Sequence, residues 1–411
     1  VKMAKALDKA GVDAIDVSSA SYDTYNYWLE PTSFEPGWRK YMAAAVKKEV
    51  SVPVLAANLI RSPKQAEEQL EEGIQDFVCL GRPHIADPHW ANKVMEGRED
   101  EIKRCICCLY CMESMQHNAY CGTHANCSVN PMLGHEKEQL KKDGNGRTVV
   151  IVGAGAAGLT AAEFLGKRGF KPIVLEKQAQ AGGQLQLADK PPLKDKIDWC
   201  VEDLVTACEK NGAEIRYNTT ADEDTIAALD PYAVVIATGA LAVRPRSIPG
   251  TDLPTVYTTT EILDGSIKLS GKKVAVIGSG MTGLETAEML CSQKNHVIMV
   301  EMAETIAPGT WMQHIDDCMP RLKAAGTEFI TGHKLSAITP GKIEIQKTGT
   351  ENLRLVDADY VVLSLGVRPD NALYEKIKGK YPRVFVIGDA EKTGRIADAT
   401  AAGYKIGKEL Q

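Results

Sequence analysis

A glycine-rich pattern that occurs twice with the same spacing is the strongest constraint on how this 411-residue chain folds. In each copy an apolar run leads into three glycines, a helical stretch and, one strand later, an acidic residue. These residues are Gly153, Gly155, Gly158 and Glu176 in the first copy, and Gly278, Gly280, Gly283 and Glu301 in the second. The first glycine permits a tight turn, the second lets the backbone approach a pyrophosphate, and the third lets the helix pack closely on the strand. Because all features agree in both copies, the sequence predicts two α/β units that each bind a dinucleotide, rather than glycine-rich turns without a ligand.

Further motifs distinguish the two units. Gly183 and Gln184 follow the first acid closely, and the strand expected over 384–387 ends in Gly388 and Asp389 before a helix that starts near residue 397. Over residues 148–411 these motifs resemble the flavoprotein reductases with two dinucleotide-binding domains. The resemblance implies that 148–250 and 366–411 form an FAD domain, with Gly183, Gln184, Gly388 and Asp389 among the FAD contacts. Residues 251–365 would form an NAD(P)H-binding domain inserted into it.

Glu301 also bears on which nicotinamide cofactor binds. A carboxylate at the adenosine ribose repels a 2′-phosphate, and no arginine follows Glu301 directly, so we expect NADH rather than NADPH. Disulfide reductases share this fold but need a pair of redox cysteines close to the flavin. The cysteines beyond residue 147 form no close pair, which disfavours dithiol chemistry; they are Cys200, Cys208, Cys291 and Cys318.

Six of the eleven cysteines lie between residues 105 and 127. Cys105, Cys108 and Cys111 form C-x2-C-x2-C, a spacing that can wrap thiolates around one side of an iron–sulfur cluster, with a distant cysteine, Cys127 or Cys121, as the fourth ligand. Structural zinc is the competing interpretation, because four thiolates suit it too. The cluster is too dense for a secreted disulfide protein, and the chain opens with no signal segment. We therefore expect a metal or 4Fe–4S site within residues 99–147 and a reducing, cytoplasmic location.

Residues 1–98 alternate between helical and strand patterns. Helices are expected over 1–10, 38–48 and 62–72, the last one started by Ser62-Pro63, and strands over 14–17, 52–56 and 76–80. Three β/α units in this length are typical of a parallel sheet.

Two of these strands resemble a known barrel family. The stretches 52–58 and 77–83 resemble the last two barrel strands of the Old Yellow Enzyme family. With the cysteine pattern and the double dinucleotide module, the chain resembles the branch that contains 2,4-dienoyl-CoA reductase, 2-enoate reductase, bile-acid ene oxidoreductases and trimethylamine dehydrogenase. The resemblance implies an incomplete (β/α)8 barrel over residues 1–98 that binds FMN. Backbone around Asn58 and Gly81 and the Arg82 side chain would hold the FMN phosphate, with an ion pair as the alternative role of Arg82. The Asn-Pro after Cys127 matches the family and favours Cys127 as the fourth cluster ligand.

Three departures from the family pattern affect the expectations. Leu59 stands where dienoyl-CoA reductase has an arginine, so one expected cation is missing. Tyr22 is the nearest match to that enzyme's substrate-side histidine, and a phenol can donate a proton to a substrate carbonyl; packing within its loop is the alternative role. Only three β/α units precede the cysteines, against eight in a closed barrel. We therefore expect the chain to be the C-terminal part of a longer protein.

Together the motifs predict an α/β flavoprotein that uses NADH to reduce the C=C bond of an α,β-unsaturated carbonyl compound. Electrons would pass from NADH to FAD, a 4Fe–4S cluster, FMN and the substrate. The alternatives are an amine dehydrogenase that passes electrons outward, and a fragment with only NADH:acceptor (diaphorase) activity. The net charge of −6 disfavours nucleic acid as a partner, and no apolar run is long enough for a membrane span. The sequence leaves a homo-oligomer open.

Overall fold

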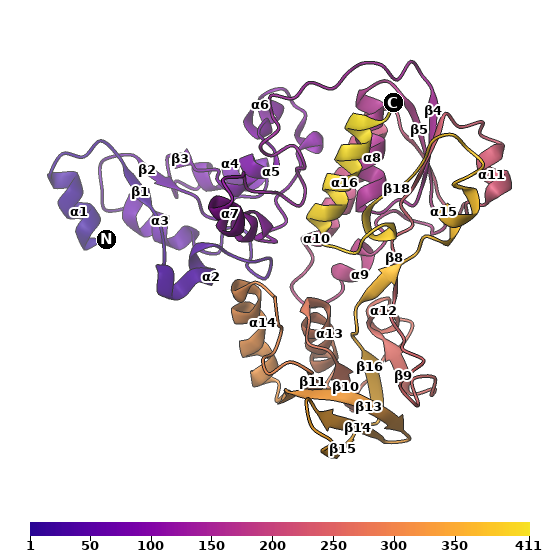
Figure 1. Ribbon diagram of the computed structural model, residues 1–411. Helices are drawn as coiled ribbons and strands as arrows, with labels where there is room; N and C mark the ends of the chain where they lie inside the picture. The colour runs from indigo at the N-terminus through magenta and orange to yellow at the C-terminus, as the bar shows by residue number, and fades with distance from the viewer.

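The computed structural model describes residues 1–411. The N-terminal part of the chain forms a small parallel sheet (Figure 1). Its strands are β1 (Ile15–Val17), β2 (Val54–Ala56) and β3 (Phe77–Val78), in the order β1-β2-β3. The helices beside them are α1 (Lys2–Lys9), α3 (Lys40–Lys47) and α4 (Pro63–Glu71). Ser62 caps α4, because its hydroxyl accepts the Gln65 N–H at 3.2 Å. The expected three β/α units are confirmed, although β3 is shorter than the predicted 76–80.

Further helices lie between β1 and α3 and between β3 and β4. They are η1 (Tyr22–Thr24), α2 (Tyr25–Trp28), α5 (Arg82–Ala86), α6 (Trp90–Met95), η2 (Glu99–Glu101) and α7 (Tyr110–Tyr120). In Figure 1, α7 lies between the N-terminal sheet and the long C-terminal helix α16 (Ile396–Glu409). The cysteine segment therefore occupies the junction between two parts of the molecule.

The first glycine unit forms a five-stranded parallel sheet. Its order is β18-β7-β4-β5-β6, with β4 (Thr148–Val152) at the centre. The other strands are β5 (Lys171–Leu175), β6 (Glu214–Arg216), β7 (Ala233–Ile236) and β18 (Val384–Val386). Its helices are α8 (Ala156–Lys167), α9 (Leu185–Ala188), α10 (Ile197–Lys210), α11 (Glu223–Ala227), α15 (Ala372–Ile377), η3 (Gly388–Ala390) and α16. The central strand β4 is a buried apolar run, as expected for a strand covered on both faces.

The second glycine unit repeats this plan and adds an antiparallel sheet. Its parallel order is β12-β11-β10-β16-β9, formed by β9 (Val256–Thr258), β10 (Lys273–Ile277), β11 (His296–Val300), β12 (Glu328–Ile330) and β16 (Tyr360–Leu363). Helices α12 (Thr259–Leu263), α13 (Met281–Ser292) and α14 (Met312–Ala324) pack beside it. The added strands are β13 (His333–Thr339), β14 (Lys342–Lys347) and β15 (Leu353–Asp357).

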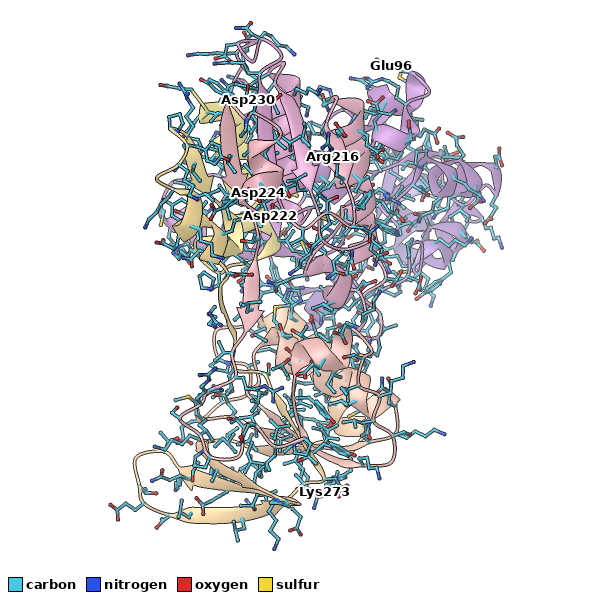
Figure 2. The ribbon with its side chains drawn as sticks, turned by 90° about the vertical axis from the view of Figure 1, so that its right-hand side faces the viewer. Glu96, Arg216, Asp222, Asp224, Asp230 and Lys273 are labelled. Atoms are coloured by element: carbon cyan, nitrogen blue, oxygen red, sulfur yellow. The ribbon has the colours of Figure 1, made fainter.

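Two antiparallel strands join the glycine units. They are β8 (Ala240–Ala242) and β17 (Val367–Pro369), which directly follow Gly239 and Gly366. Figure 2 shows the resulting waist, with Arg216 and Asp222 on the upper body and Lys273 on the lower one. The chain thus leaves the first unit after β7 and returns to it at β18. None of the helices combines the length and apolar character that a bilayer crossing requires.

Candidate functional site

The glycines of both units lie where their lack of a side chain is needed. Gly153 has φ +106°, and a Cβ on Gly158 would lie 2.0 Å from the Gly153 carbonyl oxygen. Gly278 has φ +97°, and a Cβ on Gly283 would lie 2.3 Å from the Gly278 carbonyl oxygen. The middle glycines, Gly155 and Gly280, have no atom within 4 Å of a built Cβ. Each unit therefore combines a tight turn, a close helix and an open backbone surface at a helix N-terminus, which suits a pyrophosphate.

The two acids occupy equivalent places beside these turns. Glu176 accepts the Ala154 N–H at 2.8 Å, and Glu301 accepts the Ser279 N–H at 2.9 Å. Burial raises the pKa of Glu301, but hydrogen bonds from Ala303 and Ser279 outweigh it and lower that pKa below its usual value. A fixed carboxylate at the end of the second strand is the group that bonds ribose hydroxyls in dinucleotide sites. The residues of both units therefore fit a dinucleotide.

The structure brings the remaining FAD residues to the first unit. Gly155 and Gly182 form an isolated parallel β-bridge, and a Cβ on Gly183 would lie 3.4 Å from the Gly155 Cα. Gln184 donates from Nε2 to Asp389 Oδ2 at 3.3 Å, although the two residues lie far apart in the sequence. A Cβ on Gly388 would lie 2.8 Å from the Ala157 Cβ at the start of α8. Burial raises the pKa of Asp389. The four residues thus lie together around one helix N-terminus.

Four cysteines line one small cavity of about 10 Å³ at the junction between the N-terminal part and the first glycine unit. They are the predicted ligands Cys105, Cys108, Cys111 and Cys127, whereas Cys121 is exposed and lies outside this cavity. No three His, Cys, Asp or Glu side chains are placed to hold a metal ion. The structure thus brings the four predicted ligands around one site, which both a cluster and a structural zinc ion require. Burial raises the pKa of the Cys111 thiol to about 12.

The walls of this cavity come from the N-terminal part and the cysteine segment, and the first glycine unit packs against that segment. Arg82 and Ile85 come from the N-terminal part. On the other side, Cys105, Cys108 and Cys127 pack against the core of the first glycine unit. The Thr400 hydroxyl on α16 also donates to the Ser128 carbonyl at 3.0 Å. The cavity therefore lies between the segment expected to bind FMN and the unit expected to bind FAD.

The residues expected at the FMN phosphate have other partners in the structure. The buried Asn58 donates from Nδ2 to the Gln69 and Gln75 side chains at 3.1 and 2.5 Å. Gly81 precedes α5, near the carboxyl end of β3. Arg82 pairs with the buried Glu30 at 2.7 Å, so its guanidinium faces a carboxylate and the cysteine cavity. The side chains of Asn58 and Arg82 are thus already paired within the protein, and a role of the backbone near Asn58 and Gly81 at an FMN phosphate stays a prediction.

Tyr22 lies on η1 and is 75% exposed. Its ring packs against Tyr25 and Trp28, with centroids 5.9 and 5.3 Å apart. This placement combines loop packing with access to solvent, and a role of Tyr22 at a substrate stays a prediction.

Sequence reasoning missed several buried groups at this junction. Arg61 and Glu30 lie beside the cysteine segment, and no local pattern marks either of them. His314, on α14 of the second unit, lies near the Cys108 backbone. Burial and the charges of Lys194 and Arg395 lower the pKa of His314 to about 4, so its imidazole is neutral at pH 7.

Comparisons with known proteins agree with this architecture. The pyridine nucleotide-disulphide oxidoreductase family matches residues 147–404. This chain belongs to that family. Residues 1–101 match the NADH:flavin oxidoreductase / NADH oxidase family, which confirms the resemblance expected from the two strand motifs. The fold is therefore α/β, with a partial barrel-type segment followed by two Rossmann-type units.

Individual relatives cover the whole chain. An NADH oxidase of Thermoanaerobacter brockii is 37% identical over 100% of this chain and 63% of its own length. A cinnamate reductase of Clostridium sporogenes is 31% identical over 100% of this chain and 61% of its own. A solved 6-hydroxypseudooxynicotine amine oxidase of Pseudomonas geniculata N1 has a TM-score of 0.89 and 27% identity, over 100% of this chain and 63% of that one. The chain thus spans less than two thirds of the length of these relatives.

Proposed function

We propose that this chain belongs to an NADH-dependent flavin and iron–sulfur reductase that reduces the C=C bond of an α,β-unsaturated carbonyl compound. One observation carries the proposal: four cysteines line a single cavity between the N-terminal sheet and the first glycine unit. A group held there lies between two parts of one polypeptide that both match flavin- or nicotinamide-dependent families. This position suits an electron relay.

The chain's own residues divide the work. The first glycine unit, with Glu176 and Asp389, would bind and orient FAD, and the second, with Glu301, would bind NADH. The four cysteines would hold a 4Fe–4S cluster between them and the N-terminal segment, where the backbone near Asn58 and Gly81 would contribute to an FMN site. When bound, the two flavins and the cluster supply the conversion between two-electron and one-electron transfer from NADH to the substrate.

Metal and flavin analysis of anaerobically purified protein tests the relay. We expect about four iron atoms with matching sulfide per chain, and FAD among the bound flavins. Cys127→Ser should lower the iron content, whereas the matched control Cys121→Ser, at an exposed thiol outside the cavity, should leave it unchanged. Zinc, or no metal, in the unsubstituted protein would overturn the proposal.

Activity then tests the direction of electron flow. Under anaerobic conditions NADH should bleach the bound flavin, and addition of trans-cinnamate or a cyclic enone should reoxidise it with loss of the alkene. Reduction of ferricyanide alone, without alkene turnover, would support the diaphorase alternative.

An amine-oxidising enzyme is the second candidate, because an amine oxidase shares the fold at a TM-score of 0.89. In that case an amine, and not NADH, should bleach the flavin. The second glycine unit, with its glycines and acid in the same places as in the first, favours NADH.

A further inference from the structure

Positive charge is in excess around the buried carboxylate of Glu30, whose partner Arg82 lines the cysteine cavity. Three arginines with little exposure, Arg39, Arg61 and Arg82, share one buried carboxylate, Glu30. Arg39 and Arg82 pair with Glu30 at 3.0 and 2.7 Å, whereas Arg61 forms no ion pair. Buried cations without a carboxylate are costly unless another negative group lies close to them.

Arg61 is the member of this group without a charged partner. Arg61 is only 5% exposed, and its Nε donates to Cys107 Sγ at 3.0 Å. Nη1 donates to the Ile60 carbonyl at 2.6 Å, and the buried Nη2 has no hydrogen-bond partner. The protein therefore supplies one thiol and one carbonyl to a guanidinium that carries a full charge.

The position of Arg61 indicates which anion the charge faces. Arg61 follows β2 and the Asn58 loop, so it belongs to the N-terminal segment. Cys107, its partner, lies between Cys105 and Cys108, which both line the cysteine cavity. The guanidinium thus contacts the cysteine segment next to the cavity, although neither Arg61 nor Cys107 is among the residues that line it. A cluster bound by four thiolates carries negative charge and would compensate a cation there.

We propose that Arg61 is a positioning residue that stabilises the negative charge of a cluster held by Cys105, Cys108, Cys111 and Cys127, and so raises its reduction potential. The inference rests on the proposed function, because it requires that cluster. Reduction adds negative charge to the cluster, and a nearby cation in a dry site favours the more negative state. Removal of the charge should therefore make the cluster harder to reduce.

A redox titration followed by electron paramagnetic resonance tests this role independently of turnover. Arg61→Met keeps most of the side-chain volume and removes the charge, so the midpoint potential of the cluster should fall. Arg61→Lys keeps the charge and should stay close to the unsubstituted protein. The control Arg98→Met removes an exposed arginine that pairs with Glu96 and Glu101, and should leave the potential unchanged.

The outcomes separate this inference from the proposed function. Absence of iron in the unsubstituted protein would defeat the proposed function. Full iron in all variants with an unchanged midpoint potential in Arg61→Met would overturn only the role of Arg61. If Arg61→Met loses iron while Arg61→Lys retains it, the charge role is supported. If both variants lose iron equally, the residue acts through shape and the inference is wrong.

Discussion

Gln313 and Asn26 bond each other across 287 positions of sequence. Asn26 Nδ2 donates to the Gln313 carbonyl at 3.0 Å, and Gln313 Nε2 donates to Asn26 Oδ1 and to the Leu29 carbonyl, both at 3.2 Å. Ser33 adds a hydrogen bond to Asp317 at 2.6 Å. Helix α14 of the second glycine unit is thus docked on the α2 loop of the N-terminal segment, as Figure 1 also shows.

Gln313→Ala should loosen this docking. Gln313 is fully buried, and the substitution removes the Nε2 donor from the Leu29 carbonyl and from Asn26 Oδ1, at a cost of about 1–3 kcal/mol. The hydrogen bond from Asn26 Nδ2 to the backbone carbonyl of residue 313 remains possible. Amide hydrogen exchange over residues 25–29 should become faster. Met312→Ala is the matched control, because Met312 is exposed on the same helix. Unchanged exchange in Gln313→Ala would show that these hydrogen bonds do not hold the two parts together.

Substitution of the third glycine of either unit by alanine should abolish binding of the cofactor of that unit and leave the other cofactor bound. The added Cβ would meet a backbone carbonyl, which cannot move aside as a flexible side chain could. Gly158→Ala should lose FAD, seen as loss of the flavin absorbance. Gly283→Ala should retain FAD but no longer bleach with NADH. Gly379→Ala, which has open space around its Cβ, is the control, and FAD retention in Gly158→Ala would contradict the prediction.

Glu301→Ala should weaken NADH binding and reduce the preference over NADPH. Loss of a charge-assisted hydrogen bond worth about 1.5 kcal/mol raises KM for NADH about tenfold. Removal of the carboxylate also removes its repulsion of a 2′-phosphate. Steady-state ferricyanide reduction with both cofactors measures the change, with the exposed Glu351→Ala as control. If the ratio of the KM values for NADH and NADPH did not change, Glu301 would not contact the adenosine ribose.

The acid sensitivity of the protein should depend on Glu163. Burial opposes ionisation of this residue, but the charges of Lys103 and Lys167 outweigh it and lower its pKa to about 2. A carboxylate with a lower pKa in the folded state stabilises the fold above its unfolded pKa, and this contribution is lost as the pH falls toward 2.

Glu163→Gln should therefore lower the free energy of unfolding at pH 7 by about 3–5 kcal/mol, because it leaves the buried Lys103 unpaired. It should also flatten the decline in stability between about pH 5 and pH 2. Denaturant unfolding at several pH values measures both effects. Glu68→Gln is the control, because Glu68 is an exposed carboxylate that pairs with Lys64 on the surface. Equal pH slopes in the Glu163 variant and the unsubstituted protein would refute the assignment.

Local patterns in the sequence predicted most of the fold and the dinucleotide residues. These features depend on a few consecutive residues. Gly153 allows a turn with φ near +100°, and Gly158 allows a helix to pass close to the preceding strand. The two glycine units and the cap at Ser62 could therefore be predicted from local sequence patterns, whereas the insertion of one unit into the other followed from the family resemblance. The spacing of Cys105, Cys108 and Cys111 is likewise a local pattern, and it predicted that these three cysteines lie at one site.

The tertiary structure decided which groups face each other across these elements. The cavity includes Cys127 and leaves out Cys121 because of how the loop after α7 packs, and both cysteines were compatible with the spacing. Packing also turned Arg82 toward Glu30, buried Arg61 without a carboxylate, and joined Gln313 to Asn26. Burial and pairing of a charge depend on residues distant in sequence, and no local period encodes them.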